Sequence, residues 1–160
     1  MAVGLLPLIL SVIFPLCGTP GAKNIPAPGI VDFAHLTLPS SPNKALAAPT
    51  GFNPKPDLVT PAYALAPDQL FQIVRTTILA MPHTYALDDH PDHWQAAFVA
   101  RTPMANFPDI IAIAVQPDAQ GGSHLVMYSH SIYGYSDMGA NLARLTAWLA
   151  AINAKIPPQS

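Results

Sequence analysis

The sequence predicts an α+β domain, a four-stranded antiparallel meander covered on one face by two helices and preceded by a Pro-rich extended arm. Two segments, near 67–80 and 138–153, repeat apolar residues with helical spacing, and the segments between them are alternating or β-branched, as strands are. Connections between these strands are short, so consecutive strands should pair antiparallel with both helices packed on one face. A chain of 160 residues can build this as one domain with a single core.

The N-terminal segment, residues 1–22, contains no charged side chain, and residues 3–17 are almost wholly apolar. That length suits a signal-peptide core, whereas a spanning helix usually needs about 20 apolar residues. Pro7 and Pro15 disfavour a helix, and the small residue expected before a lipid-bearing Cys17 is missing. We predict a cleaved signal peptide or a retained membrane anchor, with a lipid anchor or a misassigned start as alternatives. All but the last place the protein in the cell envelope, periplasmic or membrane-anchored.

Residues 23–66 form the predicted wrapping arm. Proline removes a backbone donor and fixes φ, so this Pro-rich stretch should hold neither long helices nor central strands. Part of it should be polyproline II. It is nevertheless too apolar for a free linker, because it carries Ile30, Val31, Phe33, Leu36 and Leu38. We therefore expect the arm to lie against the domain.

The domain proper is predicted at residues 67–155. Pro67 suits the first position of a helix, and Pro82 ends that helix. The predicted strands that follow are Thr84–Leu87, His93–Arg101, Asp109–Gln116 and Ser123–Ser131. Ser136 or Asp137 should cap the last helix. Its apolar face should consist of Met138, Leu142, Leu145, Leu149 and Ile152.

Composition excludes several classes of function. Only 10% of residues are charged, against about 25% in typical domains, and the net charge is −2. Seven scattered Lys and Arg residues do not make the basic patch that nucleic acid needs, so no nucleic-acid partner is expected. The single cysteine rules out an internal disulfide framework. Asp88–His93 has side chains that can bind Zn²⁺ or Cu²⁺, but we interpret it as a solvated acidic turn and predict no metal and no cofactor.

The stretch from Ser129 to Arg144 has the pattern S-x-S-x-x-G-x-S-D-x-G-x-N-x-x-R. It resembles the C-terminal signature of a bacterial and plastid family of unknown function, DUF1499. Ile30–Ala34 with Pro42–Asn43 resembles the opening of that family, and Asn106–Asp109 resembles its middle motif. Two positions differ from many members, since Ile132 replaces an Arg and Ile110 replaces an acidic residue. The resemblance identifies a family and implies no reaction.

The meander also predicts where polar side chains meet. Two strand ends and the start of the last helix should lie at one end of the sheet, next to backbone N–H groups that favour an anion. The candidate ligand-binding residues are Arg101, Asp109, Ser129, Ser131, Ser136, Asp137, Asn141 and Arg144. The competing interpretation is a rigid junction without a ligand, in which Asp137 caps the helix and Arg101 or Arg144 pairs with Asp109.

No catalytic residue is predicted. Ser131, His130 and Asp137 have the residue types of a triad, but neighbours in a strand point to opposite faces, so His130 should not reach Ser131. The nucleophile-elbow pattern G-x-S-x-G is absent. We predict a non-enzymatic module that binds a partner or a small anionic ligand. The alternatives are an accessory structural subunit of a membrane or envelope complex and a small serine-dependent hydrolase using Ser131 or Ser136.

Overall fold

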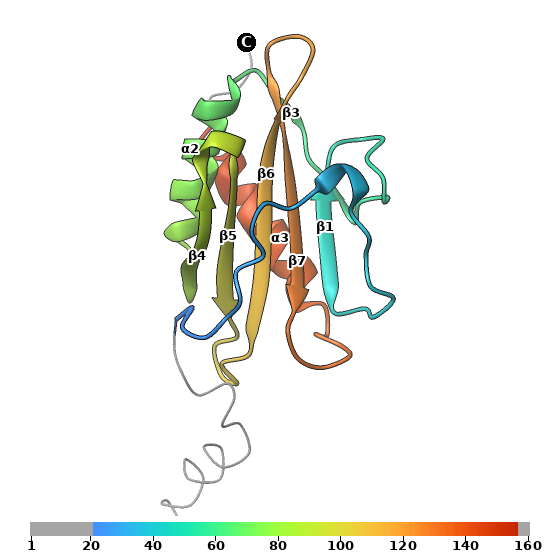
Figure 1. The fold of residues 1–160 in the computed structure, drawn as a ribbon, viewed down its shortest axis with the longest axis vertical. Coiled ribbons are helices and arrows are strands. Elements are labelled where there is room, and N and C mark those ends of the chain that lie inside the picture. The colour runs from blue at the N-terminus through green and yellow to red at the C-terminus, as the bar shows by residue number, and fades with distance from the viewer. Residues whose placement is uncertain (1–20, 157–160) are drawn as a thin grey trace, which may run out of the picture.

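A computed structural model describes residues 21–156, and these form two α-helices and a mixed seven-stranded open sheet, so the α+β class is confirmed (Figure 1). The helices are α2 (Pro67–Leu79) and α3 (Ala140–Asn153), and short 3₁₀ turns are η1 (Phe33–His35) and η2 (Pro91–His93). The strands are β1 (Lys44–Ala48), β2 (Leu58–Val59), β3 (Ala62–Tyr63), β4 (Thr84–His90), β5 (Gln95–Arg101), β6 (Pro108–Pro117) and β7 (Ser123–Ser131). The predicted signal or anchor segment lies outside these residues except for its last two positions. Within residues 21–156, no helix is long and apolar enough to cross a membrane.

The meander forms as expected. Strands β4, β5, β6 and β7 lie side by side in chain order, and every neighbouring pair is antiparallel. Ile111 pairs with Phe98 on one side and with Ser129 on the other, which fixes the register through the centre of the sheet. Strand β4 is longer than predicted and continues past Leu87 to His90, with a bulge between Ala86 and Asp88.

The predicted strand count of four is wrong, because the arm supplies β1, β2 and β3. The sheet order is β2-β1-β7-β6-β5-β4, with β3 paired to the other end of β7. Strand β1 therefore has a neighbour on each side, parallel to β2 and antiparallel to β7. The exclusion of central strands from this region failed because Asn43–Ala48, between Pro42 and Pro49, contains no proline.

The sheet is covered on both faces. Both helices pack on one face, where Phe71, Ile78, Leu145 and Trp148 share a core with the inward residues of the strands. The arm covers the other face around Phe33, whose side chain is 3% exposed (Figure 1). Its path is fixed by a pair of hydrogen bonds, in which Val31 N donates to Gln95 Oε1 at 2.9 Å and Gln95 Nε2 donates to Val31 O at 3.0 Å. The expectation that the arm lies against the domain is confirmed for these residues.

Helix α3 begins two residues later than predicted, at Ala140. Met138 has φ 51°, outside the right-handed helical region, and its side chain is 92% exposed rather than buried. Leu142, also expected in the core, is 41% exposed. The buried face of α3 consists of Asn141, Leu145, Trp148 and Ile152. An amide thus takes a core position that the apolar pattern had assigned to leucine.

Candidate functional site

The polar residues of the signature meet where β5 ends, β6 begins, β7 ends and α3 begins. We call this end of the sheet, with loops 102–107 and 132–139, the junction pole (Figure 1). Arg101 pairs with Pro108 across the β5–β6 ladder, and Asp109 pairs with Ser131 across the β6–β7 ladder. Residues far apart in sequence are therefore brought to one place, as the meander predicted.

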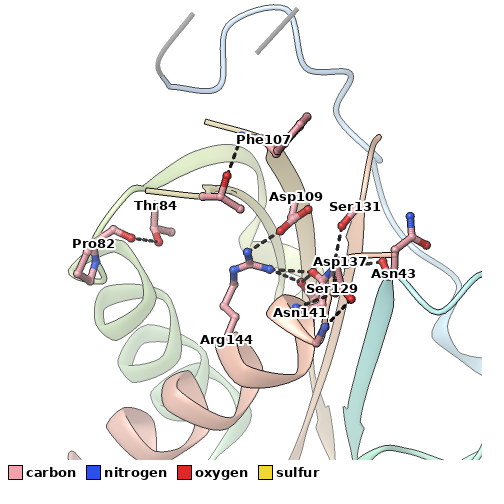
Figure 2. Close-up of polar contacts among 12 residues, drawn as sticks. Asn43, Pro82, Thr84, Phe107, Asp109, Ser129, Ser131, Asp137, Asn141 and Arg144 are labelled. Carbon is pink, nitrogen blue, oxygen red and sulfur yellow. Dashed lines mark hydrogen bonds and ion pairs between the residues drawn. The ribbon is translucent and has the colours of Figure 1, made fainter. Parts of the chain in front are cut away.

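A buried ion pair lies at the centre of this pole. Arg144 Nη2 donates to Asp109 Oδ2 at 2.5 Å, and the two side chains are 12% and 3% exposed (Figure 2). The other terminal nitrogen, Nη1, donates to Asn141 Oδ1 at 2.7 Å and to Ser129 Oγ at 3.2 Å. Charge-assisted hydrogen bonds of this kind are the strong ones, and a pair removed from water is stable only when its remaining donors and acceptors are satisfied.

Asn141 links the strands to the helix. The residue is fully buried, and its Nδ2 lies 3.0 Å from Ser131 Oγ, 2.7 Å from Asp137 Oδ2 and 3.1 Å from the carbonyl oxygen of Asn43. Its Oδ1 accepts from Ser129 Oγ as well as from Arg144. Both ends of the amide are thus used within the protein, which accounts for a polar residue in the α3 core.

The N-cap residue of α3 is Gly139, and the predicted cap, Asp137, acts from two residues earlier, where its side chain accepts hydrogen bonds from the start of the helix. Its Oδ1 accepts from Gly139 N at 3.0 Å and its Oδ2 accepts from Asn141 N at 2.8 Å. Burial opposes ionisation of this carboxyl, but the hydrogen bonds from Asn141 and Gly139 outweigh it and hold the pKa of Asp137 below its usual value. The Oγ of Ser136, which is itself exposed, accepts from Met138 N at 3.3 Å. The backbone N–H groups of Met138, Gly139 and Asn141, at the place where an anionic ligand was expected, therefore already donate to side chains of the protein itself.

Arg101 lies at the same pole but holds other segments. Its Nε donates to the carbonyl of Gly21 at 2.7 Å and its Nη1 donates to the carbonyl of Asn106 at 2.8 Å. The residue is 5% exposed. Arg101 thus attaches the start of the described chain and loop 102–107 to the end of the sheet.

Asn43 belongs to this site, although sequence reasoning did not select it. Its carbonyl accepts from Ser131 N at 3.0 Å and from Asn141, and its Nδ2 donates to Gly134 O at 2.6 Å. These bonds join the arm to loop 132–139. The available signal was the Pro42–Asn43 pair in the opening segment of the family resemblance. We call Asn43, Asp109, Ser129, Ser131, Asp137, Asn141 and Arg144 together the signature network (Figure 2).

The geometry does not assemble a catalytic triad from Ser131, His130 and Asp137. Because strand residues alternate, His130 lies on the face opposite Ser131, and its ring stacks on Tyr128 with centroids 5.1 Å apart. Burial lowers the pKa of His130 below its usual value. The hydroxyl of Ser131 is placed instead to accept from Asn141 Nδ2.

The acidic segment Asp88–His93 lies toward the opposite end of the sheet. Asp88 Oδ2 is 3.0 Å from His90 Nε2, and its pKa is lowered first by the hydrogen bond to that histidine. Asp89 pairs with Arg75 at 2.6 Å. In the part of the chain from 21 to 156, no three His, Cys, Asp or Glu side chains gather as metal ligands would.

Two hollows lie away from the signature network. A mainly apolar groove of about 570 Å³ runs between α2 and the end of α3, where Ile73, Met81 and Ala151 contribute to its wall. A second hollow of about 470 Å³ lies beside β2 and β3, with Phe52 and His124 in its wall.

The fold and the site define a two-layer α+β domain with an additional covering arm, in which a buried polar network joins strands β6 and β7 and the arm to helix α3. A model of the family described as protein of unknown function DUF1499 matches residues 36–152, so the chain belongs to this family, and the resemblance seen in the motifs is confirmed. The matched region contains every residue of the signature network. Among curated proteins, none matches the sequence.

Proposed function

We propose that this protein is a non-enzymatic binding module, exported or held at a membrane, whose family signature builds a rigid surface for contact with a partner. The observation that carries the proposal is that the signature network is closed. Ser129, Ser131, Asp137, Asn141 and Arg144 bond to one another, to Asp109 or to the Asn43 carbonyl. Side chains bonded in this way support a surface, whereas a nucleophile needs a free general base within hydrogen-bond reach.

A covalent probe tests the absence of a nucleophile. Fluorophosphonates modify activated serines, so the folded protein should show no adduct at Ser131 or Ser136. Heat-denatured protein and a known serine hydrolase provide the negative and positive controls. A stoichiometric adduct at either serine of the folded protein would establish the hydrolase alternative and end the proposal.

The location is tested with a reporter fused after Ser160 in the full chain. The first charged side chain is Lys23, and an exposed apolar run of this length drives association. We expect the reporter in the periplasm or in the membrane fraction. A soluble cytoplasmic reporter on a chain that keeps Met1 would refute the export and anchoring part of the proposal.

Binding at the junction pole is supported by two side chains beside the network, Tyr135 and Met138, which are 75% and 92% exposed. Large exposed apolar residues on a rigid base are typical of contact surfaces. The doubly substituted Tyr135→Ser/Met138→Ser protein should keep its melting temperature and lose what co-purifies with the wild-type protein from membranes. Val59→Ser, at an exposed apolar residue on β2, is the matched control. Unchanged co-purification by the double variant would exclude this surface.

A further inference from the structure

Exposed apolar side chains gather at the junction pole. Met104 in loop 102–107 is 91% exposed, and Tyr133, Tyr135 and Met138 in loop 132–139 are exposed as well. Leu79, Tyr85 and Leu142 lie on element ends at the same pole. Among large apolar residues in the described chain, the exposed ones that lie elsewhere are Ile30 and Val59. Scattered exposed residues need no explanation, but a group at one end of a domain marks a contact surface.

The exposed carboxylates are distributed differently from the exposed apolar side chains. Exposed carboxylates lie away from the junction pole, at Asp32 in the arm, Asp57 before β2, Asp68 on α2, Asp89 on β4 and Asp92 in η2. The acids at the pole are Asp109, which is buried against Arg144, and Asp137, which caps α3. Lys23 is exposed next to Gly21. The pole therefore presents apolar side chains and one exposed cation, Lys23, while the other exposed lysines, Lys55 before β2 and Lys155 after α3, lie elsewhere.

The chain also enters the fold at this pole. Arg101 donates to the carbonyl of Gly21 at 2.7 Å, so the start of the described chain is tied to the end of β5. The residues before Gly21 contain no charged side chain. The uncharged segment therefore joins the described chain at the junction pole.

We propose that the junction pole rests on the lipid surface of a membrane, with Met104, Tyr135 and Met138 at the level of the headgroups. This inference rests on the proposed function and names its partner, because the surface at Tyr135 and Met138 then contacts membrane lipid and residues 1–20 must lie at the membrane. Tyrosine has an apolar ring and a polar tip, which suits the membrane interface, and methionine adapts its shape to an irregular apolar environment. Lys23 adds attraction to anionic headgroups. The signature network gives these flexible side chains a rigid base.

Photo-crosslinking in native membranes tests the contact directly. The full chain is expressed with p-benzoylphenylalanine in place of Met104, Tyr135 or Met138, and irradiated adducts are identified by mass spectrometry. Gln120, which is exposed in the turn between β6 and β7 at the opposite pole, and Val59 serve as control positions. All five positions are exposed, so the substituted chains should keep the wild-type circular dichroism and melting temperature.

The expected result is lipid adducts at the three pole positions and none at Gln120 or Val59. Protein adducts at the pole without lipid adducts would overturn the lipid assignment and identify a protein partner. A chain that sediments with membranes but forms no adduct at the pole would overturn the inference while leaving the anchoring intact. A chain found only in the soluble fraction would overturn both this inference and the membrane placement from which it starts.

Discussion

Replacing Arg144 with methionine should destabilise the domain strongly. Arg144→Met keeps the apolar stem but removes the guanidinium, which leaves the Asp109 carboxylate charged in a site where its side chain is 3% exposed. It also removes the hydrogen bonds to Asn141 and Ser129. Breaking a buried ion pair by removing one partner costs roughly 3–5 kcal/mol, because the remaining charge is uncompensated.

This loss can be compared with the total free energy of unfolding of the domain. Domains of this kind unfold with about 5–15 kcal/mol, so the expected loss is a large fraction of the total. In thermal unfolding it corresponds to a fall in melting temperature of roughly 10–20 °C. The further substitution Asp109→Asn should cost less in the Arg144→Met protein than in the wild type, since the charge it removes is then unpaired.

The chain contains a matched control for this experiment. Arg75 and Asp89 form a second Arg–Asp pair at 2.6 Å, but their side chains are 35% and 41% exposed. Arg75→Met should therefore cost no more than about 1 kcal/mol. Urea unfolding monitored by circular dichroism measures both variants. If Arg144→Met and Arg75→Met lower the free energy of unfolding equally, burial does not strengthen the Arg144–Asp109 pair and the reasoning is refuted.

Three further predictions concern Asp137, Phe33 and His130. Asp137→Ala removes the side chain that caps α3 and should lower the free energy of unfolding by about 0.5–2 kcal/mol. Because the folded pKa of Asp137 is depressed, its contribution to stability is present above an unfolded pKa of about 3.9 and disappears as the pH falls through the folded value, so the Asp137→Asn protein should lose less stability in acid than the wild type. Phe33→Ala should cost roughly 3–5 kcal/mol in urea unfolding, since the ring is 3% exposed under the arm, and a negligible loss would make the arm a mere tether. Burial depresses the folded pKa of His130, so the unfolded chain binds more protons, and the free energy of unfolding should fall as the pH drops below about 6.5 through the folded value. NMR titration of the His130 ring should give a pKa below that of a free histidine. A normal pKa would contradict its burial beside Tyr128.

Periodicity was sufficient to predict the meander and both helices. Helix α2 begins at Pro67 as predicted, and β5, β6 and β7 differ from the predicted strands by at most two residues at either end. These segments are long and bury one regular face, so local pattern and tertiary packing agree. Short strands carry no such pattern, and β2 and β3 have two residues each. Their pairing partners depend on long-range geometry that the local sequence does not contain.

The start of α3 shows a different limit. The spacing of Met138, Leu142 and Leu145 matches a helical stripe that does not include Asn141. The structure buries Asn141 because its amide bonds to Ser131 and Asn43, which lie 10 and 98 residues away in sequence. A hydrogen-bond partner at that separation is invisible to a periodicity argument, so the polar residue was assigned to a ligand and the methionine to the core.

The closed network changes where function should be sought in this family. A short motif with many polar positions suggests a reactive site, but here the polar groups of the signature network form hydrogen bonds and an ion pair that hold the fold together. Asp137 satisfies the N–H groups that begin α3, Asn141 joins that helix to β7 and to the arm, and Arg144 neutralises Asp109. Such a set is specific because each member needs the others, which gives the signature a structural reason. If the proposed binding function holds, the large exposed side chains on the same loops, Tyr135 and Met138 above all, are the first targets for mutation.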